Sequence, residues 1–242
     1  MIYHRPAAER GNANFGWLDS HHSFSFGHYY DSQHMGWSVL RVINDDTVDP
    51  GAGFGTHGHR DMEIISYVLE GALHHRDSTG RESVLRAGEV QRMTAGSGIR
   101  HSEFNHSSSE PVHFLQIWIL PNQRNLEPGY EQQAIERQDT AQQGKLTPLV
   151  SPDCRGGSLK IHQDMVLSRL QLKADENVEL PTSSRAGYLH LISGKMNALI
   201  PDHGTIVLSK ADGLGINGEA GLALKATADS VALWFDLPAM AN

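Results

Sequence analysis

The chain has 242 residues, with 20 Lys and Arg against 28 Asp and Glu, and a formal net charge of −8. Such an acidic chain has no basic field to attract phosphates, which excludes general binding to nucleic acid or to an anionic membrane surface. The single cysteine, Cys154, excludes intrachain disulfides and cysteine-rich zinc modules. Because no bilayer-spanning apolar run and no signal peptide are visible, we expect a cytoplasmic protein.

Short runs of apolar and β-branched residues, cut by Gly, Pro, Asn and Asp, predict a protein built of strands. The expected strands are 38–43, 64–69, 113–120, 146–150, 159–162, 166–172, 188–192 and 231–237. Turns are expected at 44–46, 77–80, 86–89 and 211–213. Many short strands with frequent turns are typical of a β-sandwich or barrel.

A weak internal repeat predicts two similar halves. Residues 65–71 (ISYVLEG) resemble 189–194 (LHLISG), and the closing glycines, Gly71 and Gly194, are 123 positions apart. Residues 128–145 are rich in Gln and charge, which favours a connection between domains with one helical turn. The expected division is an N-terminal metal-binding domain at 1–130, a linker at 131–145 and a C-terminal metal-free domain at 146–242.

The chain contains 15 histidines, most of them in its first half. Histidine is the commonest metal ligand, but most polar residues of a folded protein lie at its surface. We therefore expect surface or structural roles for most of them, namely His21, His22, His28, His34, His74, His75, His106, His162 and His190.

Two pairs of residues differ from the other histidines because the members of each pair are two positions apart, so that on a strand both side chains would lie on one face. His57 and His59 form the first pair, and His101 and Glu103 form the second. Side chains at i and i+2 of a strand point to the same side. If the two segments adjoin, three imidazole nitrogens and one carboxylate can hold one divalent transition metal and leave positions open for water, substrate or oxygen.

The surroundings of these pairs resemble the two motifs of the cupins. Gly51 and Glu63 frame the first pair, and the stretch 88–105 contains the second. Thr94 stands where the usual cupin has proline. With that departure, residues 94–103 (TAGSGIRHSE) resemble the pirin family.

Further stretches carry the same resemblance. Residues 55–63 (GTHGHRDME) and 67–71 (YVLEG) fit the pirin family too. Residues 16–20 (GWLDS) and 24–26 (FSF) resemble its bacterial members, which are described as quercetin 2,3-dioxygenases.

The resemblance implies an all-β fold of two tandem cupin domains, each a jelly-roll β-sandwich or barrel, in a bicupin chain. It implies that His57, His59, His101 and Glu103 bind one divalent transition metal, while Glu63 does not bind it. Iron(II) is the expected ion, and manganese, cobalt, nickel, copper and zinc are also compatible with these ligands. In the second half, Leu180, Thr182 and Ala226 fall at the positions of the three histidines, so no ligand set is expected there.

The implied activity is the opening of a flavonol ring by O2 with release of carbon monoxide. Glu103 would be the catalytic residue that accepts the proton of the flavonol hydroxyl. Phe54, Met62, Ile64 and Trp118 are candidates for the apolar walls of the pocket. The partners are then a small aromatic, flavonol-like substrate and O2, and we expect a monomer because a two-domain cupin can satisfy its sheet edges internally.

Two other functions remain open. Animal members of the pirin family resemble iron-dependent cofactors of transcription factors, so the chain can be a redox-sensing regulatory protein with a protein partner. A cupin isomerase or sugar-binding enzyme would need polar donors around the metal, and the sequence shows no clear set. An open pocket that leads to the metal would favour an enzyme over a regulatory protein.

Overall fold

The computed structural model describes residues 1–135, 146–180, 182, 184–218 and 221–240. These residues form two compact units. The N-terminal unit comprises the described residues within 11–137 and 159–163, and the C-terminal unit comprises those within 1–10, 138–158 and 164–242. No described helix is long and apolar enough to cross a membrane. Of the predicted linker, residues 136–145 lie outside the described residues, so the division at 130 and 146 stays a prediction.

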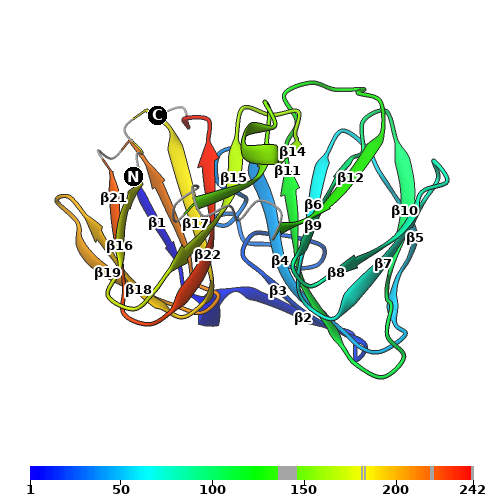
Figure 1. Ribbon diagram of the computed structural model, residues 1–242, viewed down its shortest axis with the longest axis horizontal. Coiled ribbons are helices and arrows are strands. Elements are labelled where there is room, and N and C mark those ends of the chain that lie inside the picture. Colours follow the sequence, from blue (N-terminus) through cyan, green and yellow to red (C-terminus); the bar gives the residue numbers. More distant parts are fainter. Residues whose placement is uncertain (136–145, 181, 183, 219–220, 241–242) are drawn as a thin grey trace. The chain divides into compact units, whose positions relative to one another are not determined.

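The N-terminal unit consists of two antiparallel sheets (Figure 1). The larger sheet has the order β12-β9-β6-β11-β4-β3-β2 and the smaller one the order β5-β10-β7-β8. The strands of the larger sheet are β2 (Gly11–Asn14), β3 (Leu18–His22), β4 (Leu40–Val48), β6 (Glu63–Glu70), β9 (Glu89–Thr94), β11 (Val112–Ile119) and β12 (Gly129–Ala134). The smaller sheet contains β5 (Gly53–His59), β7 (Ala72–Asp77), β8 (Glu82–Arg86) and β10 (Ile99–Asn105). The short strand β14 (Leu159–Lys160) also belongs to this unit.

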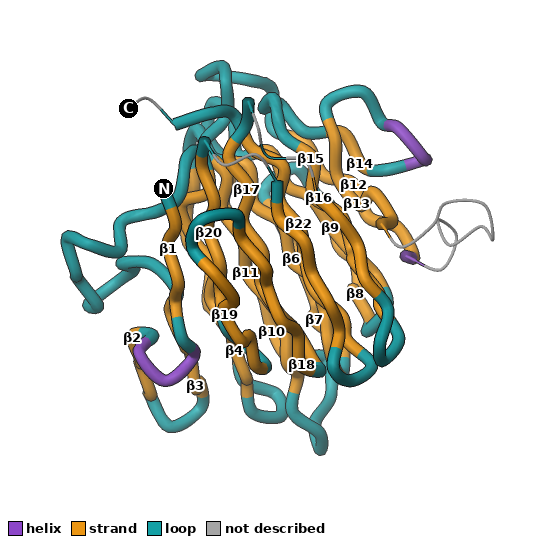
Figure 2. The backbone as a smooth tube through the Cα atoms, turned by 90° about the vertical axis from the view of Figure 1, so that its left-hand side faces the viewer, coloured by secondary structure: helices purple, strands orange, loops and turns teal. Residues whose placement is uncertain are grey.

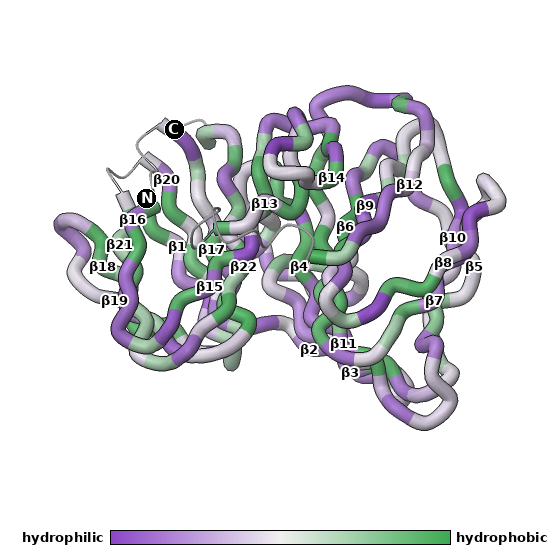
Figure 3. Tube along the Cα trace, viewed as in Figure 1, coloured by the Kyte–Doolittle hydropathy of each residue, from purple (hydrophilic) through white to green (hydrophobic). Residues whose placement is uncertain are grey.

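The two sheets of the N-terminal unit face each other across a shared interior. One apolar cluster joins Leu18 and Val48 of the larger sheet to Leu73 and Leu85 of the smaller one. Along β10 every second residue is buried, as a strand with one inward face requires. Hydrophobic and hydrophilic residues are accordingly mixed along the strands (Figure 3).

The C-terminal unit repeats this arrangement. Its larger sheet has the order β1-β20-β17-β22-β15-β13 and its smaller sheet the order β16-β21-β18-β19, with strands shown in orange in Figure 2. The strands of the larger sheet are β1 (Ile2–Arg5), β13 (Leu146–Ser151), β15 (Val166–Leu172), β17 (Ala186–Ser193), β20 (Gly213–Asn217) and β22 (Ser230–Leu237). Those of the smaller sheet are β16 (Asn177–Leu180), β18 (Lys195–Ile200), β19 (Gly204–Ser209) and β21 (Leu222–Ala226). The described helices are the short 3-10 segments η1 (Ala7–Glu9) and η3 (Arg155–Gly157).

The internal repeat of the sequence corresponds to equivalent strands. The order β9-β6-β11-β4 of the N-terminal unit matches β20-β17-β22-β15, and β5-β10-β7-β8 matches β16-β21-β18-β19. Strands β6 and β17 are both eight residues long and start 123 positions apart, as the repeat predicts. The all-β prediction is confirmed, and each unit has its own apolar core.

Two expectations about local structure are wrong. Residues 44–46 do not form a turn but continue β4, because Asn44 and Asp46 pair with β3 and β11 on either side and bond to polar groups of β3. The start of the segment 128–145 is not a connection, since β12 pairs with β9 over its whole length. In the sequence both segments resemble turns or connections, because polar residues at successive positions hide the alternation of apolar and polar residues that marks a strand.

Gly53 allows β5 and β10 to approach closely. An added Cβ would lie 2.3 Å from the carbonyl oxygen of Glu103 and 2.4 Å from Cα of Phe104. Backbone atoms cannot give way as a flexible side chain can. The glycine therefore matters for packing and for the placement of Glu103.

We expect Gly53→Ala to lower the free energy of unfolding by about 1–3 kcal/mol, because β10 must move to admit the methyl group. Urea denaturation followed by circular dichroism measures the loss. Gly55→Ala is the matched control, since no atom lies within 4 Å of its added Cβ. An equal loss in both variants would contradict the close-approach argument.

Candidate metal centre

Three histidine side chains converge between β5 and β10. The two strands pair antiparallel with His57 opposite His101, and His59 lies two residues further on β5. The ring centroids of His57, His59 and His101 are 4.4 to 4.9 Å apart. One nitrogen of each ring lies within 4.8 Å of the others. The two segments that carry the histidines therefore do adjoin, as neighbouring strands of one sheet.

The hydrogen bonds of His57 leave the nitrogen that faces the cluster without a proton. Its Nδ1 lies 2.8 Å from the carbonyl oxygen of Gly55, which can only accept, so Nδ1 carries the hydrogen. Its Nε2 then offers a lone pair, and it lies 3.0 Å from Nε2 of His101. Two nitrogens bound side by side at about 2.1 Å from one ion would lie about 3 Å apart. This donor set fits a divalent transition metal.

The surroundings keep the imidazoles neutral. Burial, together with the neighbouring His57 and His75, lowers the pKa of His101 to about 3, although Asp77 acts against the fall. Burial lowers the pKa of His59 to about 4, with His101 and His57 acting in the same direction. Both rings are therefore unprotonated at neutral pH, the form in which imidazole binds metals.

Glu103 lies beside the histidine group rather than at its centre. Its carboxylate, 2 % exposed with its residue, accepts hydrogen bonds from Nε2 of Gln116 at 2.8 Å and from Oγ of Ser66 at 3.4 Å. Its donor atoms form a second cluster with those of His101 and His75. Glu103 thus shares His101 with the three-histidine cluster. Its role as a fourth ligand stays a prediction.

Several residues of this region were not singled out by the sequence. His75 and His22, which we expected to be surface or structural, are buried at 0 % and 4 % exposure and lie among interior polar groups. Gln116 and Ser66 reach the carboxylate of Glu103 from two strands of the larger sheet. One local signal was available: His75 and Asp77 have the same i and i+2 spacing as the other pairs.

Glu63 belongs to a separate buried network. Its carboxylate accepts a hydrogen bond from Thr94 at 3.1 Å and lies 3.3 Å from Nδ1 of His162 and 4.0 Å from Nε of Arg92. Burial raises the pKa of Glu63, and Arg92, Thr94 and His162 act against that rise. Neither His-rich cluster of the described residues contains Glu63, and its expected role outside the metal site stays a prediction.

An aromatic cavity of about 480 Å³ lies elsewhere in the same unit, and none of His57, His59 and His101 lines it. Phe26, Tyr29 and Phe54 line it together with the polar residues Ser20 and Asp46. Ring contacts lead from this cavity to the cluster, because Trp118 lies 5.2 Å from Phe26 and 5.0 Å from His59. A second, more polar hollow of about 500 Å³ opens at His59 itself, between β5 and β10.

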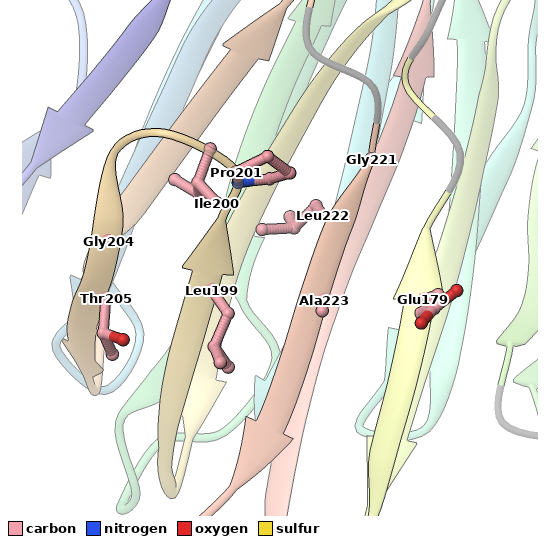
Figure 4. A pocket seen from close by; sticks show the side chains of 9 residues that line it. All are labelled: Glu179, Leu199, Ile200, Pro201, Gly204, Thr205, Gly221, Leu222 and Ala223. Atoms are coloured by element: carbon pink, nitrogen blue, oxygen red, sulfur yellow. The ribbon is translucent and has the colours of Figure 1, made fainter.

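The equivalent positions of the C-terminal unit carry different chemistry. Leu180 and Ala226 are packed in its apolar core, and Thr182 is buried. A cavity of about 490 Å³ lies over its smaller sheet, lined mainly by apolar side chains such as Leu199 and Leu222 with Glu179 at its side (Figure 4). No cluster of three metal-binding side chains occurs in the part of this unit that the structure describes.

Comparison with known proteins identifies the two halves. Residues 4–119 match the family model described as Pirin, and residues 148–237 match the model described as Quercetinase C-terminal cupin domain. The chain is 49% identical over 239 residues to a quercetin 2,3-dioxygenase of Escherichia coli strain K12, covering 98% of this chain and 99% of that protein. It is 41% identical over 244 residues to a putative quercetin 2,3-dioxygenase of Pasteurella multocida, covering 98% and 100% of the two chains.

A solved structure shows the same fold with a metal. The bacterial pirin YhhW of E. coli, in complex with nickel(II), superposes with a TM-score of 0.91 and 48% identity over 99% of this chain and 100% of that chain. This likeness and the histidine geometry support a divalent metal site in the N-terminal unit. Near full-length identity, the two matched models and the shared fold show that this two-cupin chain belongs to the pirin family.

Proposed function

We propose that the chain is a metal-dependent dioxygenase that opens the ring of a flavonol such as quercetin with O2 and releases carbon monoxide. The observation that carries the proposal is the pair of imidazole nitrogens 3.0 Å apart, which ring contacts of Trp118 with His59 and Phe26 connect to an aromatic cavity. The names of the relatives at 49% and 41% identity support the same reaction. A cytoplasmic location and a monomeric state accompany this proposal as predictions.

His57, His59, His101 and Glu103 would hold the ion. Three neutral nitrogens and a carboxylate accept ions from manganese to zinc, and we propose iron(II) for this chain. When bound, the metal would lower the pKa of the flavonol hydroxyl and bring substrate and O2 together. Metal analysis of the purified protein tests this assignment directly, because nickel(II) is the ion held by the E. coli relative.

Glu103 is the proposed acceptor for the proton of that hydroxyl. Gln116 donates to Oε2 of Glu103 at 2.8 Å, and the hydroxyl of Ser66, which lies 2.8 Å from Oε1 of Gln116, is 3.4 Å from the other carboxylate oxygen. Ser66 is itself held by Nε2 of Gln91 at 3.0 Å. A carboxylate fixed in this way needs little rearrangement when it takes up a proton. A proton acceptor must lie within reach of the group that it deprotonates, and a carboxylate oxygen of Glu103 lies within 4.8 Å of a ring nitrogen of His101.

The aromatic cavity is the proposed place of the flavonol rings. Its volume and its aromatic lining with a few polar groups are typical of sites for small planar ligands. The buried indole Nε1–H of Trp118, between this cavity and His59, has no hydrogen-bond partner in the described part of the chain. An open cavity of this kind supports an enzyme rather than a regulatory protein, whose partner stays a prediction.

At the polar side of the cavity, Asp46 is 3 % exposed and bonds to the hydroxyl of Ser20. Burial raises the pKa of Asp46 to about 7; Ser20 opposes the rise, and the nearby carboxylates of Asp45 and Glu103 add to it. Near neutral pH the carboxyl group is therefore partly protonated. A protonated carboxyl can donate a hydrogen bond to a substrate oxygen.

We expect His59→Ala to lose bound metal and quercetin consumption together, because it removes one of three nitrogen donors. Glu103→Gln should lower kcat by about 10²–10⁴-fold, since an amide cannot accept the proton. Aerobic turnover, carbon monoxide release and metal content are measured for each protein. His106→Ala, at an exposed histidine, is the control. If wild-type protein loaded with iron, manganese, cobalt, nickel or copper does not consume quercetin with any of these ions, the dioxygenase proposal is wrong.

We expect Phe26→Ala to raise KM for quercetin about tenfold, or by about 1.4 kcal/mol, with metal content unchanged. The phenyl ring lines the aromatic cavity and does not touch the ion. Steady-state kinetics gives KM and kcat separately. Tyr30→Ala is the matched control, because Tyr30 lies in the same loop but is 74% exposed. Equal effects of the two substitutions would argue against this cavity as the substrate site.

We expect Asp46 to lower the stability of the metal-free wild type relative to Asp46→Asn as pH rises from about 4 to about 7, while His59 and His101 act in the opposite direction in both proteins. In that range native Asp46 keeps a proton that the unfolded chain has released, because its pKa is raised from 3.8 to about 7. Each unit of pH in the window then costs about 1.4 kcal/mol. Urea unfolding of wild type and Asp46→Asn across this range measures the effect. Parallel stability curves for the two proteins would contradict it.

A further inference from the structure

A buried row of side chains continues behind His101, away from His57. Strand β7 pairs with β10 so that Asp77 lies opposite His101 and His75 lies opposite Glu103. Nε2 of His75 is 2.9 Å from Oδ2 of Asp77, and both side chains are 0% exposed. Nδ1 of His75 is 3.5 Å from Nδ1 of His101, at the outer limit of a hydrogen bond. The row therefore runs from Asp77 through His75 to the proposed ligand His101.

We propose that Asp77 and His75 are positioning residues that determine which nitrogen of His101 carries its hydrogen and so present His101 Nε2 to the metal. This inference rests on the metal site of the proposed function. It adds two residues that do not touch the ion. Ligating histidines generally need such a partner on their other nitrogen, and its loss weakens metal binding.

The direction of the hydrogen bonds follows from the acceptor at the far end. Asp77 is ionised: burial would raise the pKa of its carboxyl group, but bonds from His75 and Thr79 outweigh burial and lower it. A carboxylate can only accept, so His75 must donate its Nε2–H. With its Nε2–H committed to Asp77, His75 has Nδ1 as the nitrogen that can accept the Nδ1–H of His101. This leaves the lone pair of His101 on Nε2, the atom 3.0 Å from Nε2 of His57.

Asp77 is itself held in place by the turn that follows β7. Its Oδ1 accepts the backbone N–H of Thr79 at 2.8 Å and the hydroxyl of Thr79 at 2.6 Å. Oδ2 is the atom that meets His75. The two oxygens therefore have distinct partners, and the carboxylate cannot turn without breaking bonds on both sides.

The ring of His75 is also packed from its other face. Tyr130 of β12 lies 4.7 Å away, with its ring tilted by 33° relative to the imidazole. The hydroxyl of Tyr130 is bound to Ser83, Gln91 and Gln132 at 2.6 to 2.9 Å. Since Tyr130 is fixed in this way, His75 is confined between Tyr130 and His101. Such confinement is what a positioning residue requires.

A neighbouring pair of the same chemistry provides a natural control. His74 lies next to His75 on β7 but on the opposite face, and its Nε2 is 2.9 Å from Oε1 of Glu82. The two side chains are 30% and 51% exposed. Strand β7 thus carries the histidines of two histidine–carboxylate pairs of equal length, one behind His101 and one at the surface, where Glu82 belongs to β8.

Asp77→Asn is the decisive variant because the asparagine side chain has nearly the same size and shape as aspartate and differs only in offering an NH2 group in place of one oxygen. The two donors of Thr79 would hold the amide oxygen, which turns the NH2 group toward His75. His75 must then accept at Nε2 and carry its hydrogen on Nδ1, and this hydrogen points at His101. The hydrogen of His101 is thereby driven to Nε2, where it blocks the metal.

The test has two readouts, neither of which is turnover. Titration with cobalt(II), followed by its visible absorption, should show about 10–100-fold weaker binding for Asp77→Asn than for wild type. Nitrogen-15 NMR of the metal-free protein should show the His101 hydrogen on Nδ1 in wild type and on Nε2 in Asp77→Asn. Glu82→Gln should match wild type in both measurements.

A second variant keeps the test informative if Asp77→Asn does not fold. His75→Leu removes the acceptor for Nδ1–H of His101 and should also weaken cobalt(II) binding at least tenfold. Unchanged affinity and an unchanged His101 hydrogen in the folded variant would overturn the proposal. Failure of the dioxygenase proposal has another signature, namely wild-type protein that binds cobalt(II), shows the expected His101 hydrogen and does not consume quercetin.

Discussion

The double pairing of β10 is the constraint on which the site depends. On one side β10 pairs with β5, which brings His101 opposite His57, and on the other it pairs with β7, which brings His75 and Asp77 alongside. Backbone hydrogen bonds join β10 to both neighbours, its register with β5 shifts between His101 and Glu103, and Gly53 leaves no room for a side chain between β5 and β10. Strand β10 thus fixes both neighbours of the His101 ring, with His57 on the side of the proposed metal and His75 on the other side.

Burial decides the chemistry of that strand's inward face. It keeps His59 and His101 neutral, and it obliges Glu103 to find a donor, which Gln116 of the larger sheet supplies at 2.8 Å. Each inward polar group is therefore tied to a group from a different strand. Buried polar networks of this kind are stable only when their members are satisfied, and they hold their side chains rigidly. A rigid set of donors is what a metal site needs.

The two units show how little of this chemistry belongs to the fold. They share strand order and the 123-residue offset between β6 and β17. In the C-terminal unit, however, apolar side chains fill the interior, including Leu180 and Ala226 at positions related to the histidines. The same sheet arrangement can thus enclose a polar site or an apolar core. Function resides in a few inward positions rather than in the architecture.

Local periodicity by itself determined the strand content of the chain, the likeness of its halves and the two pairs His57–His59 and His101–Glu103, since a period of two residues shows which side chains share a face. It could not place His75 and Asp77 behind His101, continue β4 through Asn44, or add β1 to the C-terminal unit. These features come from pairing between distant strands. Local sequence constrains such pairing weakly, because each strand offers the same backbone groups to any neighbour, and only burial of the whole interior selects the partner.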